Sequence, residues 1–220
     1  MIASIFKTIV GILLLPVSLA ATKAFAVELG QIKQLDGSAE YFLNGVLIYL
    51  VIHLVLHKPD FFYVFGHEVA HALAALLCGG RVNSFNVSAR GGAVTTSKSN
   101  SFIALFPYFF PTYTILVWLA YFFTTLFYHK GNFMPHFLFL VGFTLALHLI
   151  MTADSLKIKQ PDIFKTGYLF SISMVYVLNL LLISFILSLV FAGFSFSQFF
   201  LSGAERSGEI YQAIYSQLFL

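Results

Sequence analysis

The sequence predicts an all-α polytopic membrane protein with five to six transmembrane helices and a small β-hairpin after the third of them. Of its 220 residues, 59% are hydrophobic and only 10% are charged, whereas soluble proteins carry about 45–50% apolar and about 25% charged residues. The apolar stretches are as long as the roughly 20 residues that a helix needs to cross a bilayer. They also lack the alternating polarity of the strands of about 10 residues in a membrane β-barrel.

The charge and cysteine content excludes several other classes of protein. The chain carries 12 Lys and Arg against 9 Asp and Glu. These are too few charges to solvate a globular surface of this size, and such hydrophobicity also excludes a disordered chain. A net charge of +3 does not indicate a nucleic-acid partner. The single cysteine excludes both an internal disulfide and a cysteine-based zinc cluster. We therefore expect a single domain over residues 1–220, embedded in the lipid bilayer.

Six apolar stretches are candidates for the membrane helices. Five of them contain no Asp, Glu, Lys or Arg, and the sixth contains one acid, Glu68. In order along the chain, these stretches are residues 8–22, 41–57, 61–80, 99–129, 131–153 and 166–204. We expect the core of the domain to lie over about residues 61–192.

The first stretch admits two interpretations. Lys7 precedes a short apolar run, and Ala24-Phe25-Ala26 has the small-x-small form of a signal-peptide cleavage site. Residues 1–26 are therefore either a signal peptide or the first membrane helix, and we favour the helix.

The chain between the third and fourth stretches has a different character. Residues 81–96 are rich in alternating and β-prone side chains around Arg90-Gly91-Gly92, a pattern typical of a β-hairpin. The following stretch, residues 102–128, is long for one helix and contains Pro107 and Pro111. Prolines inside a helix break or kink it, so we expect an interruption there. It either opens a water path into the protein or simply kinks a packed helix.

One short motif in the third stretch indicates metal chemistry. His67-Glu68-Val69-Ala70-His71 is an H-E-x-x-H pattern within an apolar helix. Residues at i and i+4 share one helical face about 6 Å apart, so both imidazoles can bind one zinc ion. Glu68 is rotated by roughly 100° from His67, so it can reach a zinc-bound water without becoming a ligand. Ionisable groups are costly in a membrane helix and favour a functional role, although they can also serve as polar contacts between helices or as a proton path.

Two histidine ligands with a glutamate that reaches the zinc-bound water are typical of a zinc hydrolase. Zinc lowers the pKa of its bound water towards about 7, a glutamate takes the proton, and the resulting hydroxide attacks a carbonyl that the metal polarises. The motif therefore predicts a zinc cofactor, Zn²⁺, with His67 and His71 as ligands and Glu68 as the general base.

On these residues the chain resembles the site-2 protease family of intramembrane zinc metalloproteases, in a compact form without a PDZ domain. The resemblance covers about residues 61–187 and implies a three-helix membrane core, a peptide-binding strand after the motif helix, and an aspartate as third zinc ligand. The residues that carry it are His67, Glu68, His71, Leu77-Cys78-Gly79-Gly80-Arg81, Arg90-Gly91-Gly92, Pro107-Tyr108 and Gln160-Pro161-Asp162-Ile163.

The third ligand is where the sequence departs from the family. Typical members carry an N-x-x-P-x-x-x-L-D-G segment that is absent here, and the nearest downstream acids are Asp154 and Asp162. We favour Asp162, which follows a proline at a helix start as the family aspartate does. Asp154, at the end of an apolar helix, is the alternative. His148 is a further candidate ligand, or a buried histidine bonded to a neighbour.

The resemblance implies a zinc-dependent metalloendopeptidase that hydrolyses peptide bonds in or near transmembrane segments, with a membrane protein or peptide as substrate. A small chain without organellar targeting is typical of the bacterial inner membrane. Two alternatives stay open. In the first, the protein is a protease-like binding or regulatory subunit without catalytic activity. In the second, it is a channel or proton-coupled transporter that uses His67, Glu68 and His71 as a proton relay.

Overall fold

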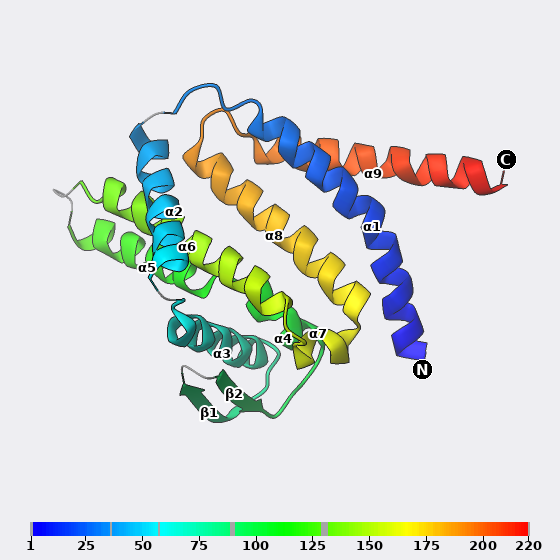
Figure 1. Ribbon diagram of the computed structural model, residues 1–220, viewed down its shortest axis with the longest axis horizontal. Helices are drawn as coiled ribbons and strands as arrows, with labels where there is room; N and C mark the ends of the chain where they lie inside the picture. Colours follow the sequence, from blue (N-terminus) through cyan, green and yellow to red (C-terminus); the bar gives the residue numbers. More distant parts are fainter. Residues whose placement is uncertain (1, 36, 57, 89–90, 129–131, 220) are drawn as a thin grey trace. The chain divides into compact units, whose positions relative to one another are not determined.

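The computed structural model describes residues 2–35, 37–56, 58–88, 91–128 and 132–219, and it is helical apart from one β-hairpin (Figure 1). This confirms the predicted all-α membrane fold with a small hairpin. The elements in chain order are α1 (Ile2–Leu29), α2 (Gly37–Val55), α3 (Asp60–Leu77), β1 (Val82–Ser88), β2 (Gly91–Thr96), α4 (Ser101–Leu105), the 3₁₀ turn η1 (Phe106–Tyr108), α5 (Thr112–Phe127), α6 (Met134–Leu156), α7 (Pro161–Thr166), α8 (Tyr168–Val190) and α9 (Phe196–Phe219).

Within the described residues, four helices are long and apolar enough to cross a membrane, namely α1, α2, α6 and α8. A fifth span is counted if α4 with η1 and α5, which are bent by 73° relative to each other, form one broken span. The bend lies at the predicted interruption. Helix α3 is not among these spans, since His67, Glu68 and His71 lower its hydropathy. The described residues therefore contain four candidate spans, or five if the broken pair is one span. Only the second number falls within the predicted five to six.

The chain divides into two compact units, residues 37–162 and residues 1–36 together with 163–220. In the second of these units, α1 packs against α8 and α9. The Ser173 hydroxyl on α8 donates a hydrogen bond to the Gly11 carbonyl on α1. Helix α1 continues through Ala24-Phe25-Ala26 without a break. The expectation of a single domain, and that of a retained first helix, stay predictions.

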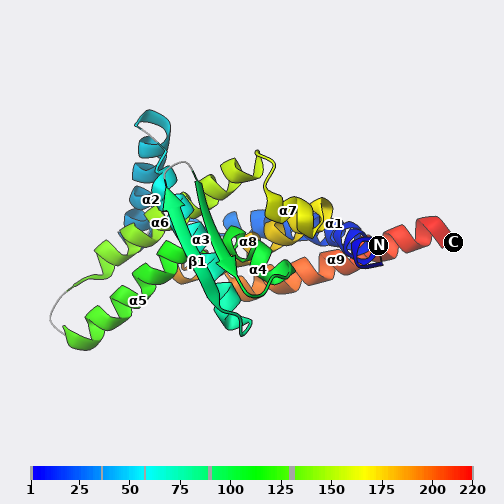
Figure 2. The same ribbon diagram turned by 90° about the horizontal axis from the view of Figure 1, so that it is seen from below.

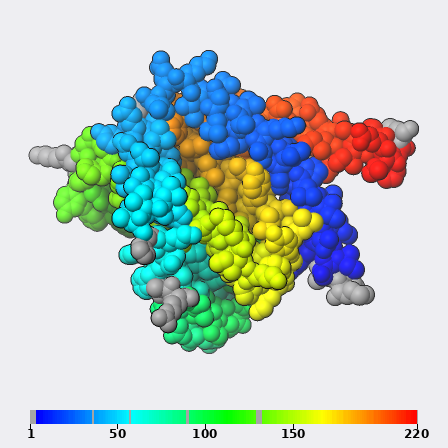
Figure 3. Space-filling model, in the orientation of Figure 1, coloured from blue at the N-terminus to red at the C-terminus, as the bar shows by residue number. Residues whose placement is uncertain are grey.

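In the unit of residues 37–162, which holds the motif, α2 lies along α6, and Figure 3 shows their surfaces side by side. Glycines allow this close approach. A Cβ at Gly45 would lie 2.0 Å from the Phe139 carbonyl oxygen, and one at Gly142 would lie 2.1 Å from that of Phe42. Small residues at helix crossings of this kind are typical of membrane proteins. This close packing determines the position of α6 against α2, and α6 leads into the segment that carries Asp162.

Helix α3 packs through a face of small side chains. Ala70, Ala74 and Ala75 are fully buried in a cluster with Ile103 and Phe106. Small residues on this face let the segment around α4 approach the helix backbone closely. The apolar contacts therefore bring α4 and η1 against the helix that carries the motif.

The end of α3 and the hairpin follow from local sequence. Gly79 has φ 69°, a left-handed conformation that glycine adopts without strain and that ends helices. Strands β1 and β2 then pair antiparallel, with Val87 opposite Gly92 and Phe85 opposite Val94. Figure 2 shows the hairpin running beside α3. The predicted hairpin is thus present, although Arg90 of its turn lies outside the described residues.

Candidate metal centre

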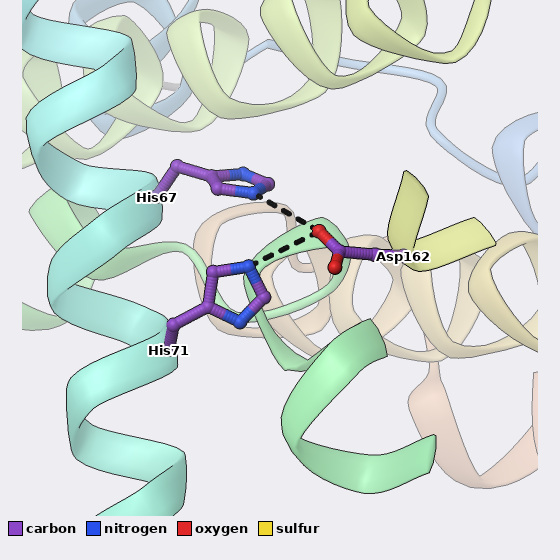
Figure 4. A group of neighbouring side chains, drawn as sticks. All are labelled: His67, His71 and Asp162. Carbon is purple, nitrogen blue, oxygen red and sulfur yellow. Dashed lines mark ion pairs between the residues drawn. The ribbon is translucent and has the colours of Figure 1, made fainter. Parts of the chain in front are cut away.

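Helix α3 presents His67 and His71 on the same face. Their ring centroids lie 4.8 Å apart at an interplanar angle of 80°, and Figure 4 shows both imidazoles pointing away from the helix toward one carboxylate. This arrangement follows from the i, i+4 spacing of the motif.

The carboxylate is that of Asp162, at the start of α7. Its Oδ2 lies 3.3 Å from Nε2 of His71 and 4.0 Å from Nε2 of His67. The three candidate ligand atoms all lie within 4.8 Å of one another. The side chains of both histidines are 12% exposed, and that of Asp162 is 33% exposed. The group is therefore largely enclosed but can be reached from the side of the carboxylate.

This donor set fits zinc. Tetrahedral zinc with ligand bonds of 2.0–2.1 Å separates neighbouring donor atoms by about 3.3–3.4 Å. The distance from Asp162 to His71, 3.3 Å, matches this value, and the distance from Asp162 to His67, 4.0 Å, is longer. Two histidines and one carboxylate are also a ligand set of catalytic zinc sites, in which the fourth position stays open for water or substrate. We conclude that these residues have the chemistry and spacing to hold one zinc ion.

The two imidazoles are oriented in different ways. Nδ1 of His71 donates a hydrogen bond to the Ile103 carbonyl oxygen at 2.9 Å, and this leaves Nε2 available to bind a metal. Nδ1 of His67 is buried, and among the described residues no group hydrogen-bonds to it. The His67 ring instead contacts Tyr108 at 5.0 Å, edge to face, and Tyr63 at 5.7 Å between ring centroids.

The charge state of Asp162 favours cation binding. Burial raises the pKa of its carboxyl, but the contacts with His67 and His71 lower it more, so that the pKa lies well below the usual value of about 3.9. The side chain is therefore a carboxylate at neutral pH.

Asp154 lies in a separate cluster of ion pairs. Its carboxylate accepts hydrogen bonds from Lys58 and Lys157, each at 2.6 Å, and it lies 3.4 Å from Nε2 of His53. Neither Asp154 nor the buried His148 belongs to the group formed by the two histidines and Asp162. The structure thus brings the favoured acid to the motif and holds the alternative acid elsewhere. Metal binding by Asp162 stays a prediction.

Glu68 opens onto a cavity of about 900 Å³ that His67, His71 and Asp162 also line. The residue is only 7% exposed. Strand β2 lines the same cavity and lies directly against the glutamate, since a Cβ on Gly92 would be 2.6 Å from Cγ of Glu68. The cavity has the size of a typical ligand pocket. The motif and the strand therefore face the same cavity.

Some groups of the site were not anticipated from the sequence. Tyr63 precedes His67 by one helical turn, a spacing that is visible in the sequence. Ile103 contributes a backbone atom, for which side-chain patterns give no signal. The contact of Tyr108 with His67 depends on the fold around η1.

Comparison with known proteins gives a match to a protein family. A family model described as Peptidase M50B-like matches residues 42–216, a range that contains the motif, the hairpin and Asp162. No curated protein and no solved structure matches the chain.

Proposed function

Because the chain belongs to the Peptidase M50B-like family, and with it to the site-2 proteases, we propose that it is a zinc-dependent endopeptidase of the membrane. It hydrolyses peptide bonds in or near the transmembrane segments of membrane proteins, and we propose the bacterial inner membrane as its location. The observation that supports this most directly is the convergence of His67, His71 and Asp162 beside Glu68 in one cavity.

The three convergent side chains would hold the metal through Nε2 of His67, Nε2 of His71 and Oδ2 of Asp162. A zinc ion bound there would acidify a water molecule and polarise the carbonyl of the peptide bond. The hydrogen bond from His71 to Ile103 keeps that imidazole in the tautomer that presents Nε2.

Glu68 is placed to move the proton. Its carboxylate accepts a proton from the attacking water and delivers it to the nitrogen of the leaving amine. In the balanced reaction, one O–H bond of water and one C–N bond break, and one C–O and one N–H bond form. Val64 and Gly92 flank the Glu68 side chain, and this contact limits where its carboxylate can point.

Strand β2 supports a peptide substrate. Within the described residues the sheet has only two strands, so one edge of β2 has no strand partner. The residues of β2 that line the cavity include Gly91, Gly92 and Ala93, whose small side chains leave the backbone accessible. A transmembrane substrate must be unwound before hydrolysis, and an extended peptide can then pair with such an edge.

The test is Glu68→Gln in the full chain, purified in detergent and reconstituted with single-span test substrates. We expect the variant to keep zinc by elemental analysis and to lose cleavage, because the amide cannot accept the proton. His67→Ala with His71→Ala is the control, and it loses both zinc and cleavage. Cleavage by Glu68→Gln at the wild-type rate would refute the proposal. If the wild type binds zinc and Glu68→Gln supports the cellular role as well as the wild type does, the result would point to a non-catalytic binding subunit.

A further inference from the structure

The two imidazoles of the candidate metal centre differ in what holds their second ring nitrogen. Nδ1 of His71 donates to the Ile103 carbonyl oxygen, whereas Nδ1 of His67 is buried and has no hydrogen-bond partner among the described residues. When Nε2 of an imidazole binds a metal, Nδ1 carries the proton and donates it to an acceptor. A buried donor without an acceptor is costly. His67 therefore needs an acceptor other than the described protein groups.

His67 lines two cavities, one on each side of its ring plane's polar edge groups. Its Nε2 faces Asp162, which lines the large cavity together with Glu68. The second cavity is small, about 20 Å³, and residues of α3, η1, α5 and α6 line it. The two nitrogens of an imidazole point in different directions, and Figure 4 shows the second nitrogen of His67 on the ring edge away from Asp162. This leaves the small cavity as the space into which Nδ1 can donate.

The small cavity has the room and the polar groups to hold one water molecule. A buried water needs a space of roughly 10–15 Å³ and roughly two to four polar partners. The polar side chains that line the cavity with His67 include Tyr63, Thr112 and His148. The Tyr63 hydroxyl is buried and has no hydrogen-bond partner among the described residues. The Thr112 hydroxyl donates to the Gly66 carbonyl oxygen at 3.0 Å, so its own oxygen can still accept a hydrogen bond.

We propose that one water molecule in this cavity accepts a hydrogen bond from Nδ1 of His67, and that the Tyr63 hydroxyl holds this water in place. Tyr63 lies one helical turn before His67, and the two ring centroids are 5.7 Å apart. A water-mediated hydrogen bond is nearly as favourable in enthalpy as a direct one. Tyr63 is thus a positioning residue that orients the imidazole through the water. This inference rests on the proposed zinc site.

The first test is Tyr63→Phe, which removes the hydroxyl and keeps the ring beside His67. Outer groups that orient metal ligands contribute roughly 10–100-fold to metal affinity. We therefore expect zinc affinity, measured by competition with a chromophoric chelator, to fall by roughly 10-fold or more, and the visible spectrum of the cobalt-loaded protein to change. The matched control is Tyr113→Phe. Tyr113 lines the same cavity, but its hydroxyl donates to the Phe62 carbonyl, so its loss should leave both measurements unchanged.

The second test detects the water itself by nuclear magnetic resonance of the zinc-loaded chain with isotope-labelled histidine. We expect the Nδ1–H proton of one zinc-bound histidine, His67, to show cross-relaxation with the water signal, and this transfer to weaken in Tyr63→Phe. The corresponding proton of His71 is the internal control. It should show no such transfer, because it is donated to the Ile103 carbonyl.

Two results would overturn the inference and leave the zinc site intact: a zinc affinity and cobalt spectrum of Tyr63→Phe that match the wild type, or no transfer from water in the wild type. An equal loss of affinity in Tyr113→Phe would also overturn it, because the effect would then come from helix packing. A wild-type chain that binds no zinc is a different result, since it contradicts the proposed function and this inference with it.

Discussion

Replacing Gly92 with alanine probes the contact between strand β2 and the proposed general base. The added Cβ would lie 2.6 Å from Cγ of Glu68 and 2.8 Å from Cγ1 of Val64. Ordinary van der Waals contacts of a Cβ begin at 3.4 Å. The strand or the glutamate must therefore move by about 1 Å, and a displacement of that size in a catalytic group costs roughly 10²-fold in rate.

We expect Gly92→Ala to lower kcat for a reconstituted test substrate by about 100-fold, with a zinc content equal to that of the wild type. The metal content is the discriminating measurement, since the three heavy atoms nearest to a Cβ at this position belong to Glu68 and Val64 and not to a candidate ligand. Gly37→Ala is the control, because a Cβ there meets nothing within 4 Å. A Gly92→Ala protein with unchanged kcat would refute the close contact, and a protein without zinc would show that the strand supports the ligands instead.

Three further outcomes are expected. Asp162→Ala should lower the zinc bound per chain, whereas Asp154→Ala should not, because Asp162 lies beside His67 and His71 and Asp154 does not belong to that group. Equal zinc in both variants would contradict this assignment. Gly142→Ala would bring a Cβ to 2.1 Å from the Phe42 carbonyl oxygen, and overpacking of this kind destabilises by about 1–3 kcal/mol. Its Tm should therefore fall below that of Gly37→Ala. Chelation should abolish cleavage, and added zinc should restore it; cleavage that persists in metal-free protein would exclude zinc catalysis.

The parts of the fold that were predictable from the sequence are those that local patterns determine. The long apolar runs predict membrane helices, and the alternating residues around Gly91 predict a hairpin. Pro107 and Pro111 mark the bend between α4 and α5. The number of spans was less certain because α3 combines apolar length with His67 and Glu68, whose effect on membrane insertion depends on what surrounds them.

The candidate site was predictable only where its residues share one helix. The i, i+4 spacing places His67 and His71 together whatever the rest of the fold does. Asp162 and Asp154 are chemically equivalent in the sequence, and only the packing of the segment after α6 separates them. Lys157 pairs with Asp154 only three residues along the chain, but Lys58 reaches the same carboxylate from 96 residues away, and no local pattern indicates that contact.

A metal ion held by the proposed ligands would be a cross-link within the chain. His71 and Asp162 are 162 − 71 = 91 residues apart in sequence, so an ion bound to both closes a loop that contains the hairpin, the bent segment and α6. A ligand that binds only the folded state raises its stability in proportion to the logarithm of its concentration over Kd. The melting temperature should then follow the concentration of free zinc, and loss of the ion would release the loop from this constraint.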